Sequence, residues 1–258
     1  MFGPERHQNL ADALPVPRAG AVVDLGCGEG QILAALAARL DAASRLVGVD
    51  AKESELVTER AECVVADLDE RLPFSEESFD AAVCQNVIEC LHDPQAFLVE
   101  VGRILKPGGH LLLGHSDFDT LVFSTSDLDL TRRLVHRFCD TVQPWMTVAD
   151  GTVGRRLVAL ARRSPLELVR TFAWVGHHTT LERGGPAHTA ATLVAQDGRR
   201  DPDLAPRVDE WLADLQRQDE AGEFFYSLND YAVLLRKPAQ TSIVPDSSPD
   251  ATSIAPLA

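Results

Sequence analysis

An aspartate followed by three alternating glycines is the part of this sequence whose residue types and spacing most directly indicate chemistry. The stretch AVVDLGCGEGQ, residues 21–31, runs D-x-G-x-G-x-G from Asp24 to Gly30. Glycine adopts positive φ and lets another molecule approach the backbone closely. A helix that begins at Gln31 would also present free N–H groups. The stretch therefore predicts a loop that holds a ligand.

Acidic and amide side chains follow three further apolar stretches. Asp50 ends RLVGVD, Asp67 ends ECVVAD, and Gln85 and Asn86 end FDAAVCQN. A carboxylate at Asp50 can accept hydrogen bonds from both hydroxyls of a ribose. Ligands of open parallel sheets bind at the carboxyl ends of the strands, so these side chains are expected beside the glycine loop.

The elements that must position these residues alternate along the first half of the chain. Strands are expected at 21–25, 45–50, 62–67, 79–87 and 110–116, with helices at 31–40, 55–61 and 94–105. Lys-Pro-Gly-Gly at 106–109 is a helix stop and turn. Alternating apolar strands and helices predict a parallel sheet covered on both faces.

The second half of the chain has a different pattern, with helices next to one another. A short helix is expected at 5–14, and later helices at 127–142, 154–164, 186–196 and 204–222; strands are expected at 167–182 and 223–237. The last residues, rich in Ser, Pro and Thr, predict a disordered tail at 239–258.

Composition restricts the partners. The chain has 258 residues, 45% of them hydrophobic, and a formal net charge of −15. This charge argues against nucleic acid and against an anionic membrane surface. Five cysteines without a CxxC pair make a disulfide framework or a zinc site unexpected and favour a cytoplasmic location.

The glycine spacing distinguishes between two ligand classes. A dinucleotide loop, G-x-G-x-x-G, would need a glycine where Gln31 stands. D-x-G-x-G-x-G resembles instead the glycine loop of class I S-adenosylmethionine-dependent methyltransferases, in particular their small-molecule and ubiquinone/menaquinone branch. The stretch SFDAAVCQNVIECLHDPQAFLVEVGRILKPGGHLLL is similar to that family's fourth strand, helix, turn and fifth strand. The resemblance covers residues 10–116 and the last strand.

The resemblance implies an α/β fold: a Rossmann-like, doubly wound, mostly parallel seven-stranded sheet with an antiparallel last strand and an inserted helical lid. It implies a single domain at 1–238, with a core at 10–116 and 150–238 and helical insertions at about 117–150 and 183–222. S-adenosyl-L-methionine would be the co-substrate, and no metal is expected. The residues expected to contact it are Asp24, Gly26, Cys27, Gly28, Gly30, Asp50, Ala51, Asp67, Leu68, Gln85 and Asn86.

The catalytic residues are less defined by the pattern. His115 at the end of the fifth strand is the candidate general base, and Asp117 could instead bind a cationic acceptor or cap a helix. Glu89 and His92 are the next candidates. Relatives often carry a histidine where this chain has Cys90, so no base is inherited by position.

The resulting hypothesis is methyl transfer to an O, N or C atom of a small-molecule acceptor, in specialised metabolism, by a monomer or homodimer that binds neither nucleic acid nor membrane. Two alternatives stay open: a methyltransferase of protein or RNA, and a non-methylating protein that binds S-adenosylmethionine. A methyl donor carries its own driving force, so the protein must align the acceptor and remove a proton where one is present.

The identity of the ligand gives a first test. We expect micromolar binding of S-adenosylmethionine and S-adenosylhomocysteine, and none of NAD, because Gln31 replaces the third dinucleotide glycine. Isothermal titration calorimetry checks this. Tight NAD binding together with no binding of S-adenosylhomocysteine would contradict the whole interpretation.

Overall fold

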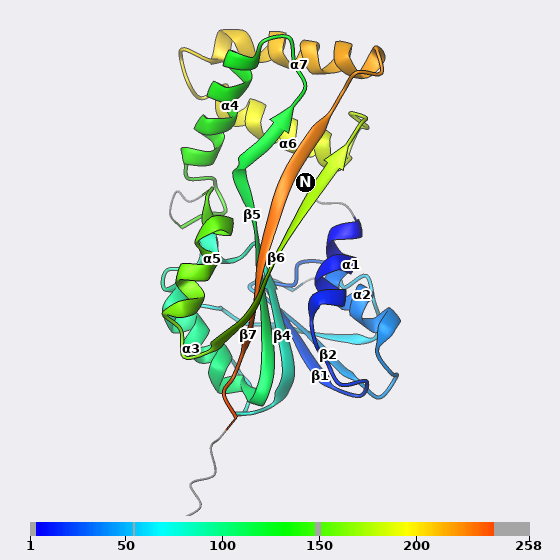
Figure 1. The fold of residues 1–258 in the computed structure, drawn as a ribbon, viewed down its shortest axis with the longest axis vertical. Helices are drawn as coiled ribbons and strands as arrows, with labels where there is room; N and C mark the ends of the chain where they lie inside the picture. The colour runs from blue at the N-terminus through cyan, green and yellow to red at the C-terminus, as the bar shows by residue number, and fades with distance from the viewer. Residues whose placement is uncertain (1–3, 54, 148–150, 240–258) are drawn as a thin grey trace, which may run out of the picture.

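One seven-stranded sheet organises the part of the chain that the computed structural model describes, residues 4–53, 55–147 and 151–239 (Figure 1). The strand order is β3-β2-β1-β4-β5-β7-β6. The strands are β1 Ala21–Leu25, β2 Arg45–Asp50, β3 Ala61–Val65, β4 Phe79–Gln85, β5 Leu105–Phe123, β6 Glu167–His178 and β7 Tyr226–Arg236. Strands β1 to β5 are parallel to one another, and β7 is antiparallel to both β5 and β6. The predicted doubly wound sheet is confirmed.

Helices cover both faces of this sheet (Figure 1). They are α1 Pro4–Ala13 and α2 Gln31–Arg39 on one face, and α3 Pro94–Ile104 and α5 Val153–Arg162 on the other. The two faces have separate buried cores, one including Leu10 and Leu33 and the other including Phe97 and Leu157. None of the helices in the described residues has both the length and the apolarity needed to cross a bilayer.

The segment between β2 and β3 differs from the prediction. No helix forms within residues 55–61; the described residues there make a loop that enters β3 at Ala61. Before β3 begins at Ala61, only Leu56 of the loop residues 55–60 packs against the core, whereas Val57 is 59% exposed. A helix this short with one inward-facing apolar residue cannot offset the cost of nucleation, so the predicted helix at 55–61 is wrong.

The inserted segments form a helical lobe, which we define as α4 Leu128–Asp140, α6 Pro186–Gly198, α7 Ala205–Glu220 and the ends of β5 and β7 next to them (Figure 1). It has its own buried core, which includes Phe123, Leu134 and Trp211. The expected helical insertion at about 117–150 begins as strand, because β5 continues to Phe123 and pairs there with Tyr226. The two long strands therefore join the core to the lobe.

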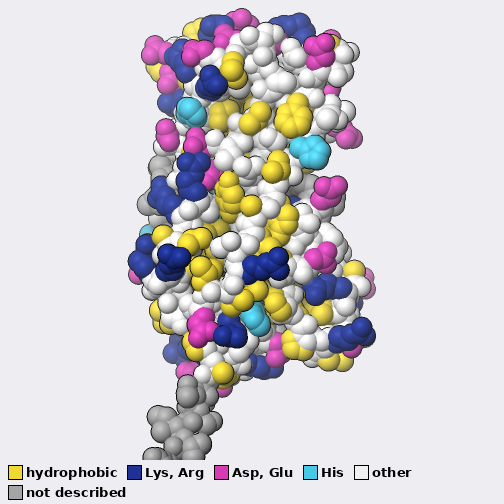
Figure 2. Space-filling model, in the orientation of Figure 1, with side chains coloured by type: hydrophobic (Ala, Val, Ile, Leu, Met, Phe, Trp, Pro, Cys, Tyr) yellow, Lys and Arg dark blue, Asp and Glu magenta, His cyan; other side chains and the backbone are white. Residues whose placement is uncertain are grey.

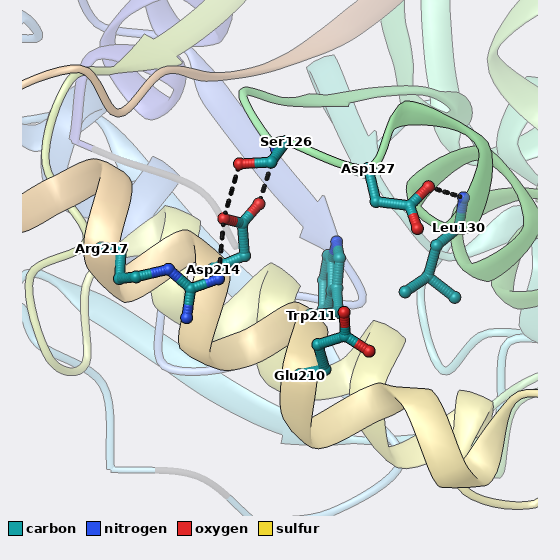
Figure 3. Close-up of a pocket in the computed structure, with 7 residues that line it drawn as sticks. All are labelled: Ser126, Asp127, Leu130, Glu210, Trp211, Asp214 and Arg217. Atoms are coloured by element: carbon teal, nitrogen blue, oxygen red, sulfur yellow. Dashed lines mark hydrogen bonds and ion pairs between the residues drawn. The ribbon is translucent and has the colours of Figure 1, made fainter.

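A carboxylate on α7 holds the turn that leads from β5 into α4 (Figure 3). Asp214 accepts hydrogen bonds from the Ser126 backbone N at 2.6 Å and from its Oγ at 2.9 Å. Asp127 then caps α4 by accepting from Leu130 N at 2.9 Å. These contacts fix the lobe against the end of the sheet.

Surface charge is mixed on the face shown in Figure 2, where hydrophobic side chains form a band between acidic and basic groups. Part of the exposed apolar surface comes from the edge strand β6, on which Val169 is 50% and Val175 63% exposed. The net charge of −15 therefore does not give this face one uniform sign.

The lobe core supplies a test of stability. Trp211 is 1% exposed, packs on Phe123 with ring centroids 5.4 Å apart, and donates to Thr131 Oγ1 at 3.0 Å. We expect Trp211→Ala to lower the free energy of unfolding by about 3–5 kcal/mol in urea denaturation. Trp145→Ala, at a 40% exposed position, is the control and should cost far less. Equal effects would show that the lobe core is not packed as described.

Candidate functional site

The glycine loop connects β1 to α2 at the carboxyl edge of the sheet. Gly26, Gly28 and Gly30 all have positive φ, at 79°, 51° and 79°. A side chain at Gly26 would collide with Val87, whereas at Gly28 it would meet nothing within 4 Å. The glycines are therefore required by backbone conformation at all three positions. Only Gly28 has an open side where a ligand can approach the backbone.

Asp50, at the end of β2, binds the backbone of Gly28. Its Oδ2 accepts a hydrogen bond from Gly28 N at 2.9 Å. The loop is also tied to β2 through Gly26 N, which donates to Val49 O at 2.8 Å. Ala51, the next residue, is exposed. The carboxylate predicted to bind a ribose thus borders the loop backbone, and its second oxygen has no hydrogen bond within the described residues.

Asp24 lies beneath the loop and is 2% exposed. Across residues 4–53, 55–147 and 151–239, no hydrogen bond reaches its carboxylate. Burial, and next the charge of Asp50, raise the pKa of Asp24 to about 7. A cationic group placed here would stabilise the ionised form, so Asp24 fits the ammonium group of a methionine moiety. Burial also raises the pKa of the neighbouring Cys27 thiol to about 12, which leaves it neutral and unreactive.

The adenine side of the predicted site follows β3. Asp67 is exposed and accepts from Asp69 N at 2.9 Å, which forms a tight turn, and Leu68 is buried beside it. His92 lies on this side as well. Its Nδ1 is 2.8 Å from Asp69 Oδ2, an ion pair that raises the pKa of His92. The structure thus places His92, a catalytic candidate, on the surface next to Asp69.

The end of β4 meets the middle of β5 through Asn86 and Ser116. Asn86 has a positive φ of 54°, and its Oδ1 accepts from Ser116 N at 2.8 Å. Gln85 lies against the Arg6 guanidinium of α1. Ser116 Oγ in turn donates to Asp230 of β7. Both predicted residues, Gln85 and Asn86, therefore lie at this edge, although their side chains bind protein groups.

Two charged residues at this edge, Arg6 and Asp230, were not anticipated. Their ion pair joins Nε to Oδ1 at 3.4 Å, and both residues are buried. A charged residue inside the apolar stretch YSLNDYAVLLR is a signal that could have identified Asp230. The partner could not be identified, because it depends on how α1 packs.

His115 and Glu89 form a buried pair. His115 is 0% and Glu89 2% exposed, and His115 Nε2 contacts Glu89 Oε2. The other ring nitrogen, Nδ1, contacts the Ser116 carbonyl. Because both nitrogens face acceptors, the ring has no free lone pair in this geometry, and the general-base role stays a prediction.

Asp117, the remaining catalytic candidate, is engaged by a cation. Arg155 of α5 binds it through two hydrogen bonds, Nε to Oδ2 at 2.6 Å and Nη2 to Oδ1 at 2.7 Å, and also reaches Asp119 at 2.9 Å. Both hydrogen bonds to Asp117 raise the pKa of Arg155. Asp117 is 0% exposed, so this geometry does not present it to an acceptor.

Metal ligation has no support in the described ranges, where no group of three or more His, Cys, Asp or Glu side chains could hold an ion. The chemistry of the cluster is instead that of carboxylates beside an open glycine backbone. Carboxylates there can bind ribose hydroxyls and a cationic amine, which matches the donor set expected for S-adenosylmethionine.

Comparisons with known proteins agree with this geometry. Residues 23–113 match the family described as Methyltransferase domain. An uncharacterized 37.1 kDa protein from a transposon of Streptomyces fradiae is 32% identical over 160 residues, 59% of this chain and 45% of that protein. A 27-O-demethylrifamycin SV methyltransferase of Amycolatopsis mediterranei is 29% identical over 115 residues, 41% of this chain and 42% of that one. The chain thus spans less than half the length of both relatives.

A solved structure shows the same fold over nearly the whole chain. It is a proposed type II methyltransferase from Anaeromyxobacter dehalogenans, with a TM-score of 0.61 at 17% identity, and the match covers 92% of this chain and 97% of that one. At this identity the likeness concerns the fold alone.

The raised pKa of Asp24 generates a test by substitution. The pKa of Asp24 in the folded protein, about 7, exceeds the reference value of 3.8. The contribution of Asp24 to the free energy of unfolding is therefore fully present below about pH 4 and is lost as the pH rises through 7. Asp24→Asn removes the buried charge. We therefore expect its melting temperature at pH 8 to exceed that of the wild type by several degrees, and the difference to shrink towards pH 4.

Ligand binding should respond in the opposite direction. Asp24→Asn should bind S-adenosylhomocysteine roughly 10- to 100-fold more weakly at pH 8, because a charged hydrogen-bond partner of the ammonium is lost. Wild-type affinity should fall as pH drops below about 7. Differential scanning fluorimetry and calorimetry measure both effects, and an Asn variant less stable than wild type at pH 8 would refute the assignment.

Proposed function

This chain belongs to the class I S-adenosylmethionine-dependent methyltransferases, and we propose that it transfers a methyl group from S-adenosyl-L-methionine to an O, N or C atom of a small-molecule acceptor in specialised metabolism. The observation that carries the proposal is the open side of Gly28, in a loop whose backbone Asp50 binds and which follows the buried Asp24 on β1. The relatives include a 27-O-demethylrifamycin SV methyltransferase, which supports a small acceptor.

The residues at the carboxyl edge of the sheet would each contact a different part of the methyl donor. Asp50 would bind the ribose hydroxyls of the donor, and Asp24 its ammonium group. Asp67 and Leu68 would border the adenine, and Gln85 and Asn86 the sulfonium. The donor supplies an activated methyl group, and the protein supplies position and the exclusion of water.

The remaining features are proposed with the same activity. We take 1–238 as one domain, with the helical lobe enclosing a compact acceptor. The chain would act in the cytoplasm as a monomer or homodimer, without nucleic acid or membrane as partners; the net charge of −15 supports both exclusions. The predicted disordered tail lies outside the described residues from 240 onward.

Asp50 provides the sharpest test of the donor site. Asp50→Ala should weaken S-adenosylhomocysteine binding by roughly 2–3 kcal/mol, or tens to about a hundredfold, because a bidentate charged acceptor is lost. Glu62→Ala, at an exposed position on the neighbouring strand β3, is the control and should leave the affinity unchanged. Equal affinity of Asp50→Ala and wild type in calorimetry would remove β2 from the site.

Transfer itself is tested with tritiated-methyl S-adenosylmethionine and metabolite extracts. We expect the label to move to a small-molecule fraction with the protein present and to be blocked by excess S-adenosylhomocysteine. Gly28→Val, which fills the open side of the loop, should abolish transfer. Binding of S-adenosylhomocysteine without any labelled product would favour the non-methylating alternative, and label on protein or RNA would favour a macromolecular acceptor.

A further inference from the structure

A buried polar network links α1 to the last strand, next to the place proposed for the methyl donor. Ser116 Oγ donates to Asp230 Oδ1, and Arg6 Nε lies 3.4 Å from the same oxygen. Ser116 also contacts Asn86, whose Oδ1 accepts from Ser116 N at 2.8 Å. Asp230 is therefore one side chain removed from Asn86, the residue proposed to border the sulfonium.

The second oxygen of this carboxylate is the accessible one. Both contacts of Asp230 are made by Oδ1, and within the described residues no hydrogen bond reaches Oδ2. Asp230 is 7% exposed, and its Oδ2 is not fully enclosed by protein. By contrast, His115 is 0% exposed and both of its nitrogens face acceptors. Of the two groups, only Asp230 has a lone pair available to another molecule.

A second unpartnered group lies on the same face of β7. Tyr226, Leu228 and Asp230 alternate along the strand and point the same way. The Tyr226 hydroxyl is buried and has no hydrogen-bond partner among the described residues. Burial, and next the charge of Asp230, raise the pKa of Tyr226, so its hydroxyl remains a proton donor. A buried hydroxyl without a partner calls for a bound group.

Resting on the proposed methyl transfer, we infer that Asp230 is the general base for a neutral acceptor with an acidic hydroxyl, a phenol or an enol, and that Tyr226 binds a second oxygen of that acceptor. Arg6 and Ser116 are positioning residues, which hold the carboxylate through Oδ1. The charges of Arg6 and Asp230 cancel, so the pair favours a neutral acceptor over an ammonium or a carboxylate.

The acceptor O–H proton passes to Asp230 Oδ2 while an oxygen lone pair forms a bond to the methyl carbon. The carbon–sulfur bond breaks, and its electron pair stays on sulfur. The products are a methyl ether, S-adenosylhomocysteine and protonated Asp230, which returns its proton to water. A carboxylate is a weak base, so it suits an acidic hydroxyl rather than an aliphatic alcohol.

The test begins with labelled S-adenosylmethionine and a panel of catechol, 2-hydroxyacetophenone and 4-hydroxycoumarin, with aniline and indole as nitrogen and carbon acceptors. We expect label on at least one hydroxyl compound, as a methyl ether by mass spectrometry. Label only on aniline or indole, or no labelled hydroxyl compound, overturns the inference. If S-adenosylhomocysteine also fails to bind in calorimetry, the proposed function fails with it.

The labelled acceptor is then used on variants. Asp230→Asn should lower kcat by roughly 10²–10⁴, with KM and S-adenosylhomocysteine affinity changed by less than about threefold. Asp80→Asn is the matched control: Asp80 is a carboxylate paired with Lys106 at 2.9 Å, and it lies at the amino end of β4, away from this edge. It should retain turnover. If Asp230→Asn retains near-normal kcat, Asp230 is not the base.

Two further measurements separate a base from a structural residue. Formate should restore transfer at least about tenfold in Asp230→Ala, which a merely destabilised variant would not show. Tyr226→Phe should weaken binding of the acceptor to the S-adenosylhomocysteine complex, by calorimetry and without turnover. If Asp230→Asn does not fold, Asp230→Glu takes its place, because it keeps the charge next to Arg6 while displacing the oxygen. No formate rescue together with unchanged acceptor binding in Tyr226→Phe overturns the inference.

Discussion

The parallel register of β1, β4 and β5 is the constraint on which the rest of the structure depends. Leu25 pairs with Cys84, and Gln85 pairs with Gly114, so β1 and β4 end at the edge beyond which β5 continues towards the helical lobe. Each strand is buried on both faces by helices, and register slippage would expose apolar side chains. Strand pairing therefore brings the glycine loop, Asn86 and Ser116 to this edge, and the hydrogen bond from Ser116 N to Asn86 Oδ1 joins two of them.

Buried charges determine what this edge can do. Three pairs of titratable side chains lie on or next to β5: His115 with Glu89, Asp117 with Arg155, and Arg6 with Asp230, and all of these residues except Arg155 are buried. Buried ion pairs contribute little net stability, but removing one partner leaves an uncompensated charge. The first two pairs engage both nitrogens or both oxygens of their β5 residue. The third leaves one oxygen of Asp230 without a hydrogen bond, and Asp24 has no protein partner within the described residues. The groups that we propose to react or to bind ligands are thus carboxylates that the protein satisfies only in part.

Much of this arrangement could be predicted from the sequence because it depends on local pattern. Asp24, the glycine loop and Asp50 at a strand end follow from spacing and from apolar stretches. The helix expected at 55–61 was wrong because propensity alone does not provide a buried face. The extension of β5 beyond Ser116 depends on pairing with β7. Likewise Ser116 and Asp230 are 114 residues apart, and only the antiparallel register brings them together.

The two long strands also explain how an insertion can serve the site. β5 and β7 pair in the core and again at Phe123 and Tyr226, where the helical lobe begins. A lobe built on strands is positioned more rigidly than one attached through loops. On β7, Tyr226 and Leu228 are part of the lobe core, and Asp230 follows on the same face of the strand.

The central claim is that a methyl donor binds across the carboxyl ends of β1, β2 and β4. A crystal structure of the complex with S-adenosylhomocysteine tests this most directly. The account predicts both ribose hydroxyls on the Asp50 carboxylate, the ligand backbone against the open side of Gly28, the ammonium group towards Asp24 and the sulfur facing Asn86. A ligand bound elsewhere, or one at this edge whose ribose makes no contact with Asp50, would contradict it.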